Sequence, residues 1–188
     1  VCERGMLEEY EKTVDRIPTS SIPTELVLQP LSEAQQTAMD QIKAAWREKD
    51  VCLLHGVTSS GKTEIYIHLI NEMLAQGKQV LYMLPEIVLT SQLTDRLRKV
   101  FGDRLGVYHS RYTDAERVEV YRKQISDNPY EIIVGVRSSV LLPFHNLGMV
   151  IIDEEHETSF KQAEPAPRYH ARNVALVMAR MAGARTLL

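Results

Sequence analysis

Short apolar runs alternate with amphipathic stretches along most of this 188-residue chain. The apolar runs are rich in Val, Ile, Leu and Tyr, which favours strands, and the stretches between them repeat apolar positions with helical spacing. The expected strands cover residues 51–56, 79–84, 105–110, 131–136, 149–153 and 186–188, and the expected helices cover 63–75, 90–100, 114–125 and 171–181. This alternation predicts an α/β fold, with a mostly parallel sheet flanked by helices on both faces.

Residues 1–30 differ in character from the rest. The charged stretch 6–17 could form one amphipathic helix, after which Pro18, Pro23 and Pro30 interrupt regular structure. We therefore expect a linker or docking segment at 1–30. The remaining residues, 31–188, are expected to form one domain, because this length and the 44% apolar content of the chain suit a single buried core.

One glycine-bounded segment carries the strongest chemical signal. Residues 56–63 read GVTSSGKT and fit the pattern G-x-x-x-x-G-K-[ST], between an expected strand and an expected helix. In that setting backbone N–H groups and the helix dipole grip nucleotide phosphates, which predicts a P-loop that binds a nucleotide. Lys62 is expected to reach the β- and γ-phosphates, and the Thr63 hydroxyl to bind Mg²⁺. The alternative is an ordinary Gly/Ser-rich turn.

The candidate phosphate-binding residues are Gly56, Thr58, Ser59, Ser60, Gly61, Lys62 and Thr63.

An acidic run follows the last long apolar segment, in the sequence MVIIDEEH at 149–156. A buried parallel strand would deliver these acids to the edge of the sheet. We expect Asp153 to serve the same Mg²⁺ ion as Thr63, and Glu154 to orient or deprotonate an attacking water. Glu155 and His156 would border the site. Alone, such a run is usually a solvated loop; together with the phosphate loop it favours nucleotide hydrolysis.

Composition and charge narrow the possibilities further. The two cysteines, Cys2 and Cys52, lie far apart in sequence and support neither a disulfide framework nor a zinc site. No apolar run approaches the length of a membrane span, so we expect a cytoplasmic protein without membrane contact. The net charge is −3, yet residues 157–188 carry five Lys and Arg against two Asp and Glu. That excess is more often a solvated surface than a nucleic-acid site.

Four segments together carry a family resemblance: GVTSSGKTEIY, LPEIVLTSQL, YHSRYTDAERVEVYRK and IIVGVRSSVLLPFHNLGMVIIDEEHETSFKQAEPAPRYHARNVA. From about Leu28 to its end, the chain resembles the first helicase lobe of the PriA family (primosomal protein N′), bacterial helicases that restart stalled replication forks. The resemblance implies an ATP-dependent DNA helicase or translocase of superfamily two that uses ATP and Mg²⁺. It also implies single-stranded and forked DNA, single-strand-binding protein, primosome components and a second helicase lobe as partners.

The resemblance assigns further residues. Gln35 is expected to hydrogen-bond adenine through its amide, with Gln36 as the other candidate; the alternative is a helix start in which Ser32 is the N-cap. Loops that follow strands place Thr90, Arg137 and Ser138 where they could hold the sugar-phosphate backbone of DNA. Helix capping by Thr90 and Ser138 is the alternative.

The segment 158–172 is the expected contact with single-stranded DNA, because aromatic rings stack on unpaired bases and basic groups meet phosphates. Glu155 and His156 are expected to couple this contact to the ATP site. The alternative is that the aromatic rings pack beneath the loop. The candidate residues of this segment are Phe160, Lys161, Arg168, Tyr169 and Arg172.

Two other function classes stay open. A small-molecule kinase or other P-loop phosphotransferase would share the phosphate loop, but it gives no reason for the acidic run and the aromatic, basic segment after it. A nucleotide-responsive binding module without turnover is the third class. Since a second lobe is expected to supply an arginine for hydrolysis, we expect this chain alone to bind ATP weakly and to hydrolyse it poorly.

Overall fold

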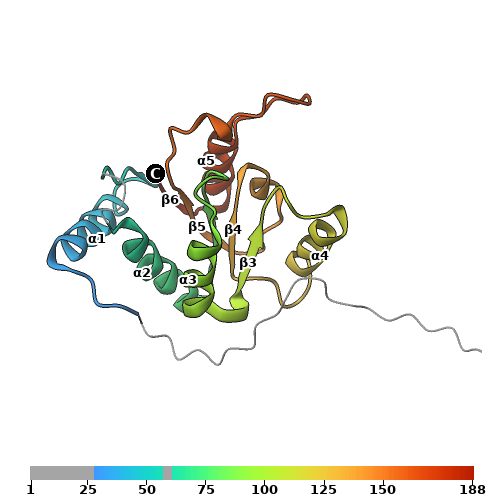
Figure 1. The fold of residues 1–188 in the computed structure, drawn as a ribbon. Helices are drawn as coiled ribbons and strands as arrows, with labels where there is room; N and C mark the ends of the chain where they lie inside the picture. Colours follow the sequence, from blue (N-terminus) through green and yellow to red (C-terminus); the bar gives the residue numbers. More distant parts are fainter. Residues whose placement is uncertain (1–27, 57–60) are drawn as a thin grey trace, which may run out of the picture.

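The computed structural model describes residues 28–56 and 61–188. Its helices are α1 (Glu33–Ala45), α2 (Lys62–Ala75), α3 (Ser91–Phe101), α4 (Asp114–Gln124) and α5 (Ala171–Ala182), with short 3₁₀ segments η2 (Gly102–Arg104), η3 (Arg137–Leu141) and η4 (Thr158–Phe160). Its strands are β1 (Val51–Cys52), β2 (Gln79–Met83), β3 (Leu105–Tyr108), β4 (Ile132–Gly135), β5 (Leu147–Ile152) and β6 (Arg185–Leu187). Figure 1 shows this alternation of strands and helices along the chain.

The six strands form one sheet in the order β1-β6-β5-β2-β4-β3, and every neighbouring pair is parallel. The predicted parallel α/β sheet is therefore confirmed. Strand β2 lies between β4 and β5, so the loops after these three strands emerge at one edge of the sheet. In open α/β sheets this carboxyl edge is where ligands bind.

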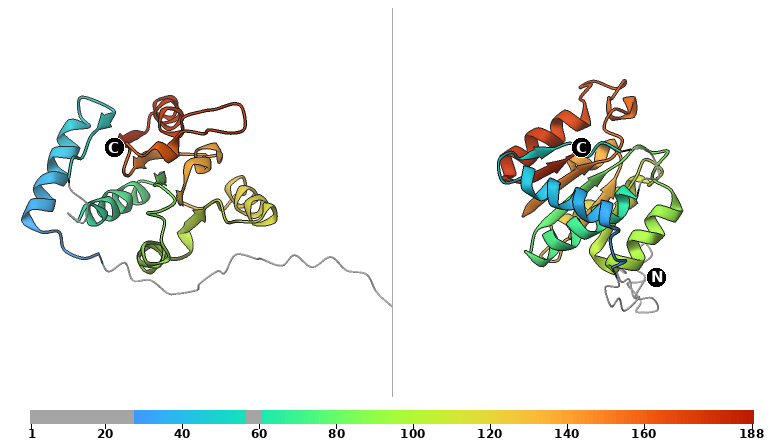
Figure 2. Two further views of the ribbon diagram at one scale, coloured as in Figure 1. Left: turned by 45° about the horizontal axis from the view of Figure 1, so that its top comes forward. Right: turned by 90° about the vertical axis from the view of Figure 1, so that its left-hand side faces the viewer.

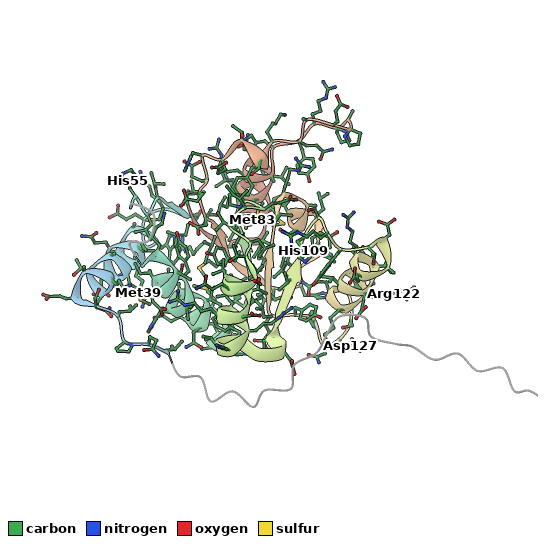
Figure 3. All side chains as sticks on the ribbon, in the orientation of Figure 1. Met39, His55, Met83, His109, Arg122 and Asp127 are labelled. Carbon is green, nitrogen blue, oxygen red and sulfur yellow. The ribbon has the colours of Figure 1, made fainter. Side chains whose placement is uncertain are left out.

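Helices cover both faces of the sheet (Figures 1 and 2). Alternate residues of β2 enter different cores: Val80 and Tyr82 pack with α1, α2 and α3, whereas Leu81 and Met83 pack with the layer that contains η3 and α5. Figure 3 shows side chains filling both layers, with Met83 near the middle of the molecule. The period of two along β2 thus becomes two apolar cores on opposite faces of one sheet.

Most predicted elements occur within one or two residues of their predicted bounds, but the first strand is much shorter than expected. The prediction of a strand over 51–56 is wrong beyond Cys52, where β1 ends. Leu54 still donates a hydrogen bond from its N to Leu188 O at 2.7 Å, but the Leu53 side chain is exposed. The regular strand therefore ends at Cys52, although hydrogen bonding to the end of the chain continues to Leu54.

The expected linker at 1–30 falls almost entirely outside the described residues, which begin at Leu28. Leu28 packs against the core formed by α1, α2 and α3, and Gln29 O lies 2.8 Å from His68 Nε2 on α2. The division into 1–30 and 31–188 stays a prediction. No helix in the described part of the chain has the length and apolarity needed to span a bilayer.

Candidate nucleotide site at the carboxyl edge of the sheet

The start of α2 has the local geometry of a phosphate loop. Gly61, the N-cap of α2, has φ +80°, a left-handed conformation that favours glycine. A Cβ at Gly61 would also lie 2.5 Å from Gln35 Nε2, so a larger residue would be strained and crowded. Lys62 and Thr63 then begin the helix, where its dipole is positive. The predicted phosphate ligands Thr58, Ser59 and Ser60 lie outside the described residues.

Lys62 lies beside the two acids that sequence analysis assigns to the same site. Its Nζ is 3.9 Å from Asp153 Oδ1 and 3.5 Å from Glu154 Oε1, and it donates a hydrogen bond to Gly56 O at 3.3 Å. These side chains are largely shielded from solvent. The structure therefore joins the end of β5 to the start of α2 in one charged cluster, although the two segments are distant in sequence.

Asp153 is held at the end of β5 by its backbone. Its N donates to Met83 O at 2.9 Å, which continues the β5–β2 ladder, and only 9% of the residue is exposed. The next residue, Glu154, has φ +50°, a left-handed conformation that is uncommon for a residue other than glycine. Strained backbone of this kind gathers at functional sites because the surrounding structure enforces it. The turn directs Glu154 back toward Lys62.

Two tyrosine hydroxyls hold the Asp153 carboxylate, a feature that sequence analysis missed. Tyr66 of α2 donates to Oδ1 at 3.3 Å, and Tyr82 of β2 donates to Oδ2 at 3.1 Å. The two rings meet edge to face, with centroids 5.6 Å apart. Burial, with a further contribution from the charge of Asp153, raises the pKa of both tyrosines, so both hydroxyls keep the proton that they donate. The sequence feature that could have indicated this contact was Tyr82, a tyrosine in an otherwise apolar strand.

Gln35 lies against the phosphate loop, while Gln36 does not. Gln35 Nε2 donates to Gly61 O at 3.0 Å, and its Oε1 accepts from Ser32 N at 2.8 Å. The Ser32 hydroxyl accepts from Gln35 N, which completes a capping box at the start of α1. Gln36 instead donates to Asp40 Oδ1 on the exposed side of α1. The structure therefore contains the helix start capped by Ser32, in which Gln35 takes part. Contact of Gln35 with adenine remains a prediction.

One ion pair links the acidic turn to the start of α5. Glu155 Oε2 lies 2.5 Å from Arg172 Nη1. Within the turn, His156 Nε2 lies 3.8 Å from Glu154 Oε2. Arg172 is the second residue of α5 and the last residue of the segment expected to contact DNA. The predicted coupling residues therefore lie between the Lys62 cluster and that segment, and Arg172 is engaged with Glu155.

Phe160 corrects the prediction for the aromatic segment. Only 1% of Phe160 is exposed, and the residue packs in the core between the sheet, η3 and α5. A ring buried there cannot stack on an unpaired base, so the alternative of packing beneath the loop holds for this residue. Tyr169 is half-buried and packs against the same core.

The basic residues of this segment make internal contacts. Lys161 pairs with His170 in an isolated antiparallel bridge that closes a hairpin, seen projecting from the body in Figure 1. Lys161 Nζ donates to Arg168 O, and Arg168 lies 2.5 Å from Glu164. The side chain of Arg168 is more than half exposed, so it remains accessible to a phosphate. DNA contact by these residues stays a prediction.

The loops after β2 and β4 form a cleft beside this hairpin. Thr90 caps α3 by accepting from Leu93 N at 3.2 Å, as its capping alternative predicts. Arg137 Nη1 donates to Lys161 O at 3.2 Å and so ties η3 to the base of the hairpin. Arg137 and Ser138 line a cleft of about 530 Å³.

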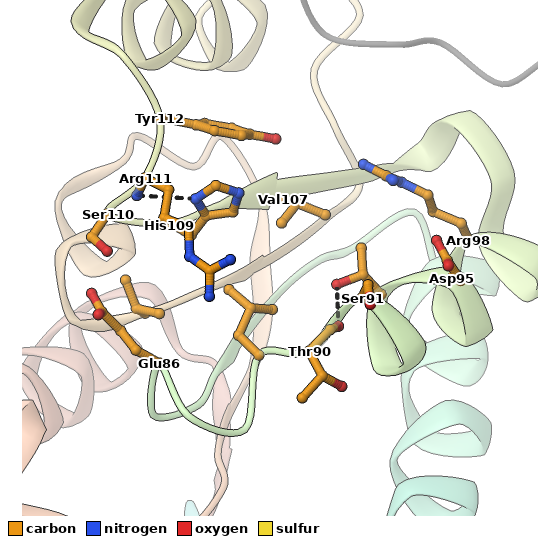
Figure 4. Close-up of a pocket in the computed structure, with 13 residues that line it drawn as sticks. Glu86, Thr90, Ser91, Asp95, Arg98, Val107, His109, Ser110, Arg111 and Tyr112 are labelled. Carbon is orange, nitrogen blue, oxygen red and sulfur yellow. Dashed lines mark hydrogen bonds between the residues drawn. The ribbon is translucent and has the colours of Figure 1, made fainter.

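A smaller polar pocket of about 240 Å³ lies next to Thr90 (Figure 4). His109 and Tyr112, which follow β3, stand on one side of it with ring centroids 4.1 Å apart. Burial lowers the pKa of His109, with Arg111 adding to the effect. Sequence analysis gave His109 no chemical role. The structure shows that it lines the carboxyl edge, close to the residues expected to hold DNA.

Comparison with known proteins identifies the class that this fold and site define. The family model described as DEAD/DEAH box helicase matches residues 32–185, and the chain belongs to this family. The match spans the phosphate loop, the acidic turn and the loops after β2 and β4. ATP binding is a property of this family.

Within this family the chain is a homologue of Replication restart protein PriA. It is 43% identical to the PriA of Bacillus subtilis (strain 168) over 179 residues, which is 93% of this chain and 22% of that protein. It is 48% identical to the PriA of Synechocystis sp. over 123 residues, which is 65% of this chain and 15% of that protein. The chain therefore spans about a fifth of the length of these relatives.

Solved structures support the fold. The SWI2/SNF2 ATPase core of Sulfolobus solfataricus, solved in complex with double-stranded DNA, matches 75% of this chain and 31% of that chain with a TM-score of 0.53 at 16% identity. The DUF1998 helicase MrfA matches 85% of this chain and 26% of that chain with a TM-score of 0.53 at 20% identity. At these identities the likeness concerns the fold, which is that of a RecA-like helicase lobe.

Proposed function

We propose that this chain is the nucleotide-binding lobe of an ATP-dependent DNA helicase or translocase of superfamily two that acts in replication fork restart. The observation that carries the proposal is the Lys62 cluster, in which a lysine at a helix start lies 3.5–3.9 Å from two acids at a strand end. The similarity to PriA supplies the setting. A kinase would not need the acidic turn that links Glu155 to Arg172 and the segment before it.

The residues present fit a magnesium–nucleotide complex. Within residues 28–56 and 61–188, no group of three or more Asp, Glu, His or Cys side chains is arranged to hold a metal ion by itself. A hydroxyl from Thr63 and a carboxylate from Asp153 are hard oxygen donors, and Mg²⁺ typically takes one or two such groups beside phosphates and water. Bound Mg²⁺ would neutralise phosphate charge during transfer.

Each residue of the cluster then has a distinct role. Lys62 binds the β- and γ-phosphates, as a mobile cation that exchanges its contacts with Asp153 and Glu154 for phosphate oxygens. Glu154, turned toward Lys62 by its left-handed backbone, orients the attacking water and accepts its proton. Gln35 recognises the base beside Gly61. A second lobe supplies the arginine that stabilises the transferring phosphoryl group.

DNA contacts follow from the same edge of the sheet. Thr90, Arg137 and Ser138 hold one strand by its backbone, and Tyr169 with the exposed Arg168 meets unpaired bases and phosphates. Glu155 and His156 connect this surface to Glu154. The proposed partners are single-stranded and forked DNA, single-strand-binding protein, primosome components and the second lobe, in the cytoplasm.

ATP turnover with and without single-stranded DNA tests the proposal. The measurement uses a longer chain that includes the second lobe, compared with the present chain at equal concentration. We expect single-stranded DNA to raise turnover at least about tenfold in the longer chain, and turnover by residues 1–188 alone to stay slow, because the second lobe is proposed to supply the arginine. Turnover that is fast and insensitive to DNA in both chains would favour a different phosphotransferase.

A further inference from the structure

Asp153 contacts two tyrosines that lie outside the sequence motifs assigned to ATP hydrolysis. Its carboxylate accepts from the hydroxyls of Tyr66 and Tyr82 and from its neighbour, Glu154 N, at 3.2 Å. Tyr66 comes from the first turns of α2, Tyr82 from the central strand β2, and Asp153 from the end of β5. Three elements that form the floor of the site therefore meet at this one carboxylate.

Because both tyrosines are buried, their hydroxyls hydrogen-bond to Asp153 and not to bulk water. Tyr82 is 0% exposed and Tyr66 is 2% exposed, so bulk water does not reach either side chain. A buried phenol needs a partner for its single proton, because an unmade hydrogen bond at such a depth is costly. Tyr66 and Tyr82 both donate to the same acid, although the aromatic rings alone would fill the core equally well as phenylalanine.

The two tyrosines also limit what else Asp153 can bind. A carboxylate offers about four acceptor directions, two on each oxygen. Among donors in the described part of the chain, Oδ1 receives Tyr66 and Glu154 N, and Oδ2 receives only Tyr82. Lys62 Nζ also lies 3.9 Å from Oδ1, so this oxygen faces the Lys62 cluster. Each oxygen accepts a buried hydrogen bond from one tyrosine, so the carboxylate cannot rotate without breaking one of them.

We propose that Tyr66 and Tyr82 are positioning residues that orient the Asp153 carboxylate so that it serves a magnesium–nucleotide complex. This inference rests on the proposed function and adds two residues to it. Neither tyrosine touches nucleotide; both act through Asp153, as partners in the outer shell of a metal site do when they orient a ligand. The two tyrosines therefore affect how strongly nucleotide binding depends on Mg²⁺. They do not affect nucleotide binding in the absence of Mg²⁺.

The test compares three substitutions of tyrosine by phenylalanine in this chain. Tyr82→Phe and Tyr66→Phe each remove one hydroxyl and keep the ring. Tyr108→Phe is the matched control, because Tyr108 is half-buried on β3, at the edge of the sheet, and packs on the opposite face. Binding of a fluorescent ATP analogue is measured over a range of Mg²⁺ concentrations and again in EDTA, and thermal melting confirms that each variant is folded.

We expect Tyr82→Phe to raise the Mg²⁺ concentration needed for half-maximal binding about tenfold, the lower end of the loss seen for outer-shell partners of metal sites. Tyr66→Phe should cause a smaller rise, because Oδ1 keeps the Glu154 N–H. Binding in EDTA should equal that of the unmodified chain in every variant, and Tyr108→Phe should match the unmodified chain throughout. If Tyr82→Phe does not fold, the shift in Tyr66→Phe decides the question.

Two results would overturn the inference alone. One is an unchanged Mg²⁺ dependence in the tyrosine variants that fold; the other is a parallel loss of binding with Mg²⁺ and in EDTA, which marks a purely structural role. In both cases the unmodified chain still binds nucleotide, and the proposed function stands. A failure of the unmodified chain to bind nucleotide under any condition would instead overturn the proposed function, and this inference with it.

Discussion

Replacing Glu154 by glutamine in the full-length protein is expected to lower ATP turnover by about 10²–10⁴-fold, the usual loss when a general base is removed. The amide keeps the shape of the side chain but cannot accept a proton from water. ATP binding should not weaken, because Glu154 pairs with Lys62 at 3.5 Å and its neutralisation frees the lysine charge for phosphates. Steady-state turnover and equilibrium binding of ATP, measured on the same preparation, separate the two effects.

Glu131→Gln is the control for this prediction. Glu131 lies before β4 and is 3.9 Å from Arg104, an exposed pair remote from the Lys62 cluster, so its loss should leave turnover unchanged. If Glu154→Gln keeps most of its turnover, Glu154 is not the base, and the strained turn at this residue has another purpose.

Truncating Phe160 to alanine is expected to destabilise the domain by about 3–5 kcal/mol, the usual cost of deleting a buried aromatic ring. Phe160 is 1% exposed and contacts the core on the α5 face. For a domain of this size the loss corresponds to a fall in melting temperature of roughly 6–20 °C. Thermal unfolding followed by circular dichroism measures it.

Tyr169→Ala provides the contrast. Tyr169 is only half-buried, so its truncation should cost less stability, while stimulation of ATP turnover by single-stranded DNA should fall and nucleotide affinity should stay nearly unchanged. Phe160→Leu, which keeps much of the apolar volume, should recover most of the stability lost in Phe160→Ala. An unchanged melting temperature in Phe160→Ala, together with lost DNA stimulation, would return Phe160 to the base-stacking role that its sequence context suggests.

The sheet was predictable because its strands are local apolar runs and the helices between them have regular spacing. The Lys62 cluster was predictable for a related reason: parallel strands end at one edge, so residues that directly follow β5 must lie near the loop that follows β1. The early end of β1 at Cys52 was not predictable, since the apolar Leu53 and Leu54 continue the strand pattern.

Most side-chain contacts between different helices and strands could not be predicted from the sequence. Nothing in the residue pattern distinguishes Tyr82, which binds Asp153, from Tyr108, which lies on another strand and packs on the other face. Likewise, Phe160 is part of an aromatic and basic segment that favours DNA contact, yet the short η4 turn directs it into the core. The contact of Tyr82 with Asp153 and the burial of Phe160 both depend on how α5 and α2 pack against the sheet. The spacing of residues along the chain does not determine that packing.

Isothermal titration of ATP into the unmodified chain, Lys62→Ala and Asp153→Asn, each with Mg²⁺ and in EDTA, tests the central claim most directly. That claim is that Lys62 and Asp153 serve one bound nucleotide. We predict that the unmodified chain binds one ATP, that Lys62→Ala loses binding in both conditions, and that Asp153→Asn loses only the part that depends on Mg²⁺. Undiminished binding by Lys62→Ala, or equal behaviour of Asp153→Asn and the unmodified chain with Mg²⁺, would contradict the claim.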